Sequence, residues 1–105
     1  MALHRQERLV LTLPPDPQLA RLTRRVTYHF CRQNGIRIPI ARKGSRTVER
    51  LCRDLLRRAA GRAREGGRAV VVILTTGLGA LEVTGRRGSR GRAHRLIRLP
   101  LPDAA

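Results

Sequence analysis

The order of its apolar patterns constrains the fold of this chain more than any single residue does. Over Leu9–Leu13 the three leucines fall on one face of a strand and Val10 and Thr12 on the other, which is typical of a half-buried strand. Two stretches with helical spacing follow, and then come apolar runs at 69–74, 80–84 and 96–101 that predict further strands. A chain of 105 residues has the size of one domain. We therefore expect a single α+β domain over residues 1–105, a two-layer sandwich whose mostly antiparallel sheet carries two helices on one face.

The first helix has clear signals at both ends. Asp16 is a suitable N-cap and Pro17 a suitable first helical residue, whereas Asn34-Gly35 supplies a stop. Its buried side is expected to be an apolar stripe with spacings of three and four, made of Leu19, Leu22, Val26 and Phe30.

The segment after this helix allows two interpretations. Residues Ile36–Ile40 fit either a short edge strand, since Pro39 excludes a central one, or a plain connector. A second helix is expected to begin at Gly44-Ser45 and to fade through Gly61. Its buried face is predicted to comprise Val48, Leu51, Cys52, Leu55 and Ala59.

The second half of the chain is expected to be mostly strand. The continuous β-branched run at 69–74 predicts a central strand covered on both faces. A turn at 76–79 leads into a strand over 80–84. Glycines and arginines dominate the next stretch, so residues 85–94 are expected to form a flexible basic loop within an ordered core spanning 5–101.

Charge points to the kind of partner. The chain holds 23 Lys+Arg against 7 Asp+Glu, a formal net charge of +16, and Lys43 is its only lysine. A GC-rich genome explains why the cations are arginines, but not why acids are scarce. This charge favours an acidic protein or nucleic acid as the partner. Tyr28 and Phe30 are the only aromatic residues, which argues against stacking platforms for bases. No run is long enough for a membrane span and no signal peptide opens the chain, so no membrane partner is expected and the bacterial cytoplasm is the default location.

Catalytic, metal and cofactor sites are not expected. Cys31 and Cys52 lack CxxC spacing and are predicted to be buried free thiols. His4, His29 and His94 have no ligand spacing. No Ser/His/Asp, Cys/His or paired-carboxylate arrangement is recognisable, and the glycine-arginine loop matches neither Walker A nor GxGxxG.

Four segments are similar to successive parts of one known family. They are LVLTLPPDPQLARLTRRVTYHFCRQNGI, TVERLCRDLLRRAAGRA, LEVTGRRGSRG and LIRLPLP. In that order they resemble the first strand and helix, the nucleotide-binding helix, a strand followed by an Asp and a glycine pair, and the closing strand of the histidine-kinase-like ATPase superfamily. The branch they resemble is that of the short bacterial anti-sigma-factor serine kinases.

The same resemblance implies a degenerate nucleotide site. Glu49 matches the family's Glu, but Arg53 stands at the Mg²⁺-binding Asn position and Arg57 at a common His position. A guanidinium only donates hydrogen bonds and stays cationic, so it cannot bind Mg²⁺. Arg86 and Arg87 replace the adenine-reading Asp, and the lid is not recognisable. These five residues would form a vestigial pocket in a non-catalytic regulator that binds a sigma-factor regulator or another acidic protein. The spacing of Glu49, Arg53 and Arg57, four residues apart along a helix, is also typical of intrahelical ion pairs on a surface helix.

A second resemblance supports a different function. With a strand over 36–40, the element order is similar to that of the Alba family of small basic chromatin and RNA-binding proteins, which dimerise and insert a basic hairpin into the minor groove. Such contacts need arginines rather than aromatic residues. This alternative predicts a nucleic-acid-binding homodimer with a continuous basic surface formed by Arg42, Lys43, Arg46, Arg86, Arg87, Arg90, Arg92 and Arg95.

Overall fold

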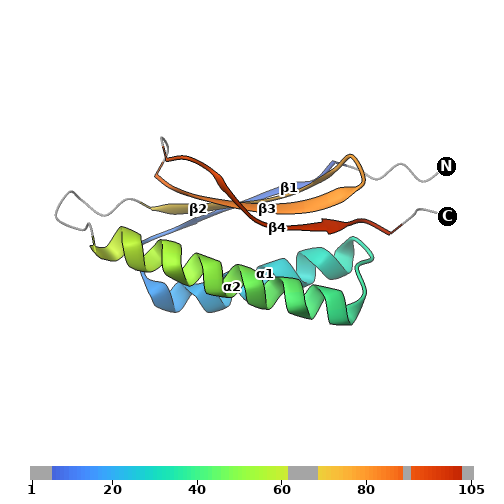
Figure 1. The fold of residues 1–105 in the computed structure, drawn as a ribbon, viewed down its shortest axis with the longest axis horizontal. Coiled ribbons are helices and arrows are strands. Elements are labelled where there is room, and N and C mark those ends of the chain that lie inside the picture. The colour runs from blue at the N-terminus through green and yellow to red at the C-terminus, as the bar shows by residue number, and fades with distance from the viewer. Residues whose placement is uncertain (1–5, 62–68, 89–90, 103–105) are drawn as a thin grey trace.

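A computed structural model describes residues 6–61, 69–88 and 91–102 and has the expected two layers, with the sheet above and the helices below in Figure 1. One antiparallel sheet has the strand order β1-β2-β3-β4, and both helices cover the same face of it. The predicted α+β sandwich is confirmed. Along the chain the elements are β1 (Arg8–Leu13), the 3-10 helix η1 (Pro17–Leu19), α1 (Ala20–Gln33), α2 (Ile38–Gly61), β2 (Val70–Gly77), β3 (Ala80–Arg87) and β4 (His94–Pro100).

The ends of the first helical segment lie where the sequence predicts them. The Asp16 carboxylate accepts a hydrogen bond of 2.9 Å from the Gln18 backbone N–H, and Pro17 opens η1. At the other end the Asn34 amide donates to the Phe30 carbonyl at 2.8 Å. Gly35 follows with φ +80°, a left-handed conformation that glycine adopts without strain.

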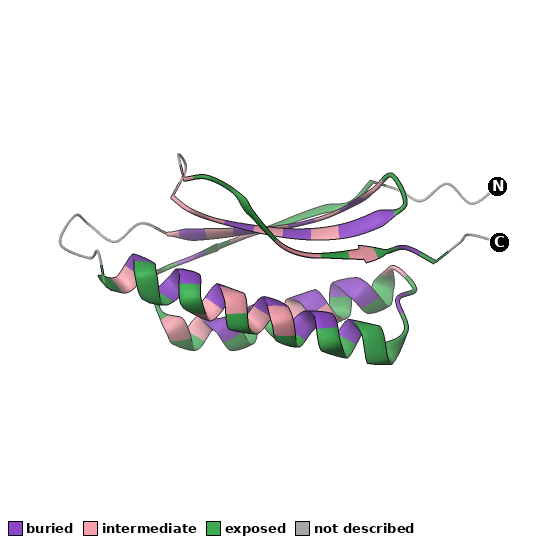
Figure 2. Ribbon diagram, viewed as in Figure 1, coloured by how far each residue is buried: buried purple, intermediate pink, exposed green. Residues whose placement is uncertain are grey.

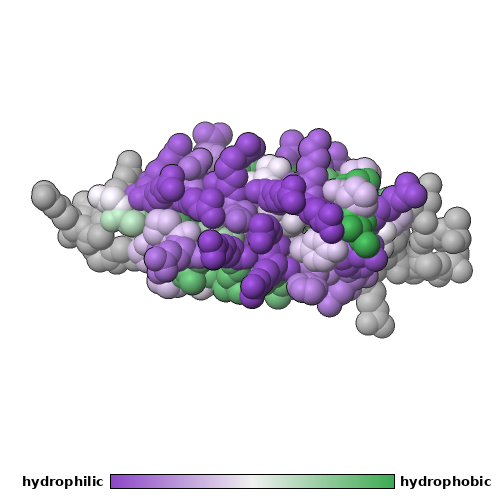
Figure 3. All heavy atoms as spheres, turned by 90° about the horizontal axis from the view of Figure 1, so that it is seen from below, coloured by the Kyte–Doolittle hydropathy of each residue, from purple (hydrophilic) through white to green (hydrophobic). Residues whose placement is uncertain are grey.

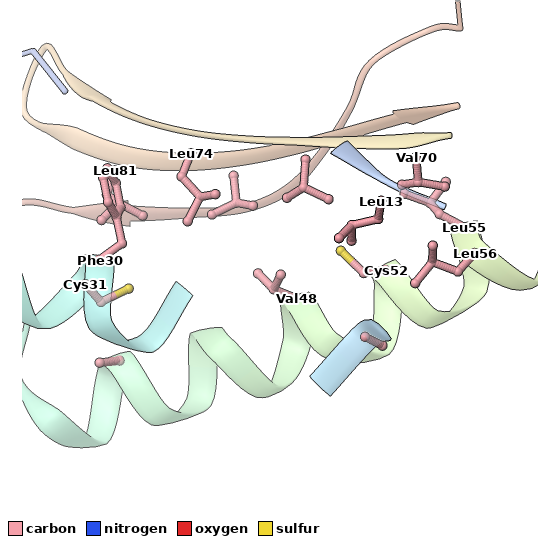
Figure 4. Close-up of a cluster of buried hydrophobic side chains, with 14 of the residues drawn as sticks. Leu13, Phe30, Cys31, Val48, Cys52, Leu55, Leu56, Val70, Leu74 and Leu81 are labelled. Atoms are coloured by element: carbon pink, nitrogen blue, oxygen red, sulfur yellow. The ribbon is translucent and has the colours of Figure 1, made fainter. Parts of the chain in front are cut away.

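The buried side of α1 differs from the predicted stripe. Leu22 is 42% exposed and Val26 only partly buried, whereas Thr23 and Thr27 are fully buried. The reason is that α1 makes most of its contacts with α2 rather than with the sheet. Small side chains let two helices approach closely, and four of the five buried residues of α1 are small: Ala20, Thr23, Thr27 and Cys31. The fifth, Phe30, reaches toward Leu81 of the sheet (Figure 4).

Helix α2 begins at Ile38, so residues 38–40 are neither the edge strand nor the connector that the sequence allowed, and the predicted helix start at Gly44 is wrong. Pro39 fits the first turn of a helix, where its missing N–H is not needed. Helical bonding starts at once, because the Ala41 N–H donates to the Arg37 carbonyl at 2.8 Å. The predicted buried face is otherwise correct, although Leu51 is only partly buried.

Gly44 and Gly85 are packing positions rather than turns. A Cβ on Gly44 would lie 3.1 Å from the nearest Leu99 methyl, and one on Gly85 would lie 2.7 Å from a Leu55 methyl. A Cβ has no room at the second distance unless the neighbours shift. The two glycines therefore let the N-terminal half of α2 lie close to β4, and let a later part of the same helix lie close to β3.

The two helices cover the same face of the sheet. Buried and partly buried residues alternate along β2, with Val70, Val72 and Leu74 facing the helices. The expectation of cover on both faces is wrong, because both helices lie on the same side of an antiparallel sheet (Figure 2). Strand β3 also runs further than predicted, to Arg87, so residues 85–87 are strand rather than loop. Of the predicted flexible loop, residues 89–90 lie outside the described residues.

Aliphatic side chains fill the space between the layers (Figure 4). Leu56 and Val48 from α2 and Leu74 and Leu81 from the sheet belong to this cluster, and all four are fully buried. Phe30 is the one buried aromatic residue of the described chain. The chain has only two aromatic residues, so aliphatic side chains supply most of the core. Burial of each large aliphatic side chain contributes about 1.5–3 kcal/mol, and this burial holds the two layers together.

Thr27 is expected to reduce stability. Its buried hydroxyl has no hydrogen-bond partner among the described residues, an arrangement that costs about 1–3 kcal/mol. Thr27→Val keeps the shape and removes the hydroxyl, so we expect unfolding to become about 1 kcal/mol less favourable and Tm to rise by roughly 4–8 °C. Thr23→Val is the matched control, because the Thr23 hydroxyl donates to the Ala20 carbonyl at 2.6 Å. Calorimetry in which Thr23→Val gains as much as Thr27→Val would contradict this account.

Candidate binding surface

The outer face of the helical layer is strongly cationic. Residues 20–61 hold 12 Lys and Arg against two acids, Glu49 and Asp54, a net charge of +10. The sheet buries the inner face of both helices, so the cations project outward, and all but the partly buried Arg53 are exposed. Figure 3 looks onto this layer and shows hydrophilic side chains over most of it, with smaller apolar patches between them. An anionic partner is the natural complement of such a surface.

Between the helices lies a small cationic hollow of about 270 Å³, which we call the helix–helix hollow. Its residues come from the middle of α1 and the N-terminal half of α2, and four of them are arginines. They are Arg24, Arg25, Tyr28, His29, Arg42, Ser45 and Arg46.

A second cationic hollow, the outer hollow, lies on the solvent side of α2 and has a volume of about 590 Å³. It shares Arg42 and Arg46 with the helix–helix hollow. Its lining is Pro39, Arg42, Lys43, Arg46, Thr47 and Arg50.

A third hollow, of about 610 Å³, is lined by the N-terminal half of α2 and by the edge strand β4, and we call it the helix–strand hollow. It differs from the other two because aliphatic side chains make up much of its lining. Lys43 and Arg98 are its two cations. The full lining is Pro39, Ile40, Lys43, Gly44, Thr47, Ile97, Arg98 and Leu99.

Glu49, the first residue of the predicted vestigial pocket, is held between two arginines. Arg53 donates to Glu49 Oε1 at 3.4 Å, and the Arg24 Nε lies 3.7 Å from Oε2. The Glu49 side chain is only 13% exposed. The sequence predicted the contact with Arg53 from the helical spacing but missed Arg24, because a contact between two helices has no local signal.

The remaining members of the predicted pocket do not join this cluster. Arg57 is exposed one turn beyond Arg53 on α2. Arg86 and Arg87 are successive residues of β3 and therefore point to opposite sides of the sheet. Within the described part of the chain, neither of them forms an ion pair or hydrogen bond with Glu49.

The predicted continuous basic surface is divided into separate groups. Arg42, Lys43 and Arg46 line the outer hollow, near the place where Gly44 meets β4. Arg86 and Arg87 flank the opposite end of the α2–sheet contact, where Leu55 meets Gly85. Gly44 and Leu55 are 11 residues apart on α2, which corresponds to about 16 Å along the helix axis.

The other arginines of that prediction lie at or near β4. Arg95 lies 3.8 Å and Arg98 3.2 Å from the Glu82 carboxylate. Arg92 is exposed just before the strand, and Arg90 lies outside the described residues. The sequence did not single out Arg24 or Arg25, which the structure adds to the cationic surface of the helical layer.

No family model matches this chain, and searches of curated proteins and of solved structures found no match either. Within the described residues, no group of histidine, cysteine and acidic side chains is placed to hold a metal ion. Nor does either described helix have the length and apolar character that crossing a membrane requires.

Cys31 and Cys52 are free and fully buried, as predicted. Burial raises the pKa of both thiols from 9.0 to about 11, and a hydrogen bond with Thr23 opposes this effect at Cys52. At neutral pH both remain protonated and unreactive, so they serve the core rather than a reactive site.

These thiols predict a loss of stability in alkali. The folded protein holds the two thiol protons more tightly than the unfolded chain does. The contribution of these thiols to the free energy of unfolding is therefore fully present below pH 9 and is lost as pH rises toward 11. The loss is on the order of 2 kcal/mol per thiol. Urea unfolding under reducing conditions at pH 8 and pH 11 measures it. A Cys31→Ala/Cys52→Ala variant should be less stable at pH 8 and show a smaller change, and an unchanged pH dependence in that variant would contradict the assignment.

Proposed function

We propose that this protein is a non-catalytic binding module for an acidic protein partner, as a reduced regulatory relative of the anti-sigma-factor ATPases in the bacterial cytoplasm would be. The observation that carries the proposal is the helix–strand hollow, an apolar groove with the cation Lys43 on its α2 side. The acidic partner would place aliphatic side chains in the groove and carboxylates against Lys43, whereas Arg98 pairs with Glu82 on the other face of β4.

The chemistry of the groove suits a peptide segment. Ile40 is 46% exposed, whereas Ile97 and Leu99 on β4 are partly buried and form the opposite wall. Covering these aliphatic groups removes apolar surface from water, which stabilises a complex by about 25 cal/mol per Å². β4 is also the edge of the sheet, where an extended segment finds unpaired backbone donors and acceptors.

The state of Glu49 supports a role without catalysis. A general base needs an accessible carboxylate, but both oxygens of Glu49 face guanidinium groups and its side chain is largely covered. The element order from β1 to β4, with two successive helices after the first strand, also agrees with the order that the ATPase resemblance implies.

Nucleic-acid binding is the second candidate, favoured by the density of cations on the helical layer. The Alba-like arrangement needs a strand between the helices, and residues 38–40 are helical instead. A nucleic acid would therefore contact the outer faces of α1 and α2, and its affinity would fall steeply with salt.

A defined pair of isoleucines tests the groove. Ile38 and Ile40 are similarly exposed and lie two residues apart, but only Ile40 lines the helix–strand hollow. With a labelled peptide of alternating leucine and glutamate as the probe, we expect Ile40→Ser to weaken binding about five- to tenfold and Ile38→Ser to leave it unchanged. Fluorescence anisotropy measures both.

Two further probes separate the candidates. A peptide with serine in place of leucine should bind much more weakly, and equal binding of the two peptides would overturn the groove as the docking site. Duplex DNA that binds below micromolar concentration at physiological salt, with a steep salt dependence and no sensitivity to Ile40→Ser, would make nucleic acid the partner instead.

A further inference from the structure

We propose that the helix–helix hollow is a binding site for a small phosphorylated anion, such as phosphate or diphosphate. This inference does not depend on the proposed protein partner, because the helix–helix hollow and the helix–strand hollow share no lining residue.

The hollow gathers more positive charge than the protein neutralises. Arg24 and Arg25 reach it from α1, and Arg42 and Arg46 from α2. Glu49 approaches Arg24, but in the described part of the chain no acidic side chain forms an ion pair with the other three. Like charges held this close repel one another, and a bound anion would remove that repulsion.

The shape and donors of the hollow match a phosphoryl group. Four guanidinium groups supply planar pairs of N–H donors, which fit phosphate oxygens two at a time. The volume of about 270 Å³ lies just below the roughly 300–1,000 Å³ of sites for drug-sized ligands, so it suits a small anion.

The walls between the arginines are ordered by the fold. Tyr28 packs against the hydrophobic core and meets the His29 ring edge-on, with ring centroids 5.8 Å apart. Ser45 is 2% exposed, and its hydroxyl donates to the Arg42 carbonyl at 3.0 Å. The backbone that carries the arginines is thus fixed, which reduces the ordering cost of binding.

Matched variants distinguish a site from a general field of charge. Arg25→Gln/Arg42→Gln removes one arginine of the hollow from each helix, whereas Lys43→Gln/Arg50→Gln removes the same charge from residues that line only the other hollows. With diphosphate as the probe, we expect calorimetric titration of the full chain to show saturable binding. The first variant should raise Kd by at least tenfold, and the second by less than about threefold.

Thermal unfolding adds a readout of opposite sign. Without diphosphate, Arg25→Gln/Arg42→Gln should leave Tm unchanged or raise it, because repulsion is relieved. With diphosphate it should lose the rise in Tm that the unmodified chain shows over sodium chloride of equal ionic strength. A variant that merely failed to fold would lower Tm in both conditions, and Arg25→Gln and Arg42→Gln made singly would then repeat the titration.

The remaining outcomes overturn the proposal. Equal losses in both double variants would mean that net charge alone attracts diphosphate. Absence of saturation in the unmodified chain would mean that no such site exists. Duplex DNA binding that depends on Arg25 and Arg42, without saturable diphosphate binding, would assign the hollow to a nucleic-acid backbone. Ile40→Ser should keep its diphosphate affinity, so failure of the protein-partner proposal is seen separately.

Discussion

The close approach of α2 to the sheet depends on two positions where a side chain is missing. Gly44 lets β4 come close to the N-terminal half of the helix, and Gly85 accepts Leu55 further along. Together they fix the line on which α2 crosses β3 and β4. The position of α2 in turn decides which of its residues face β4, which face α1 and which face water. The three hollows are consequences of this one placement.

A helical layer with a net charge of +10 must still pack as a layer. Repulsion on its outer face is offset from within, by apolar burial along α2 and by the small residues of α1 that allow close contact between the helices. Glu49 is the one acid of the described chain that forms ion pairs with arginines of both helices. Such partly exposed pairs contribute little to stability, so the fold tolerates the charge rather than depending on it. The arginines of the helical layer are therefore available for binding, because folding does not require them.

The elements that the sequence predicted well are those with local signals. Asp16 and Asn34 form hydrogen bonds with their own neighbourhood, and the alternation in β1 needs only one covered face. Pro39 misled the prediction because a proline fits both an edge strand and the first turn of a helix. Leu22 misled it because hydrophobicity does not reveal that α1 packs mainly against another helix. A close contact between two helices favours a small side chain such as that of Thr23.

The candidate site was less predictable because it depends on contacts between elements. Charge and the Alba-like resemblance grouped Arg42, Lys43 and Arg46 in one basic surface, and in the structure all three line the outer hollow. The same reasoning grouped them with Arg86 and Arg87, which the length of α2 keeps apart. Arg24 and Arg25 join the cationic surface only through the packing of α1 beside α2.

Adjacent residues of α2 face different hollows, and this links the two proposed sites. Arg42 lines the helix–helix hollow and Lys43 the helix–strand hollow, and both line the outer hollow between them. An anion bound near Arg42 lowers the positive potential at Lys43, where the carboxylates of an acidic partner would lie. Because coupling between binding sites is reciprocal, the partner would weaken anion binding by the same factor. With the apolar groove and the cationic hollow on different sides of α2, two acidic ligands would thus compete without sharing a contact.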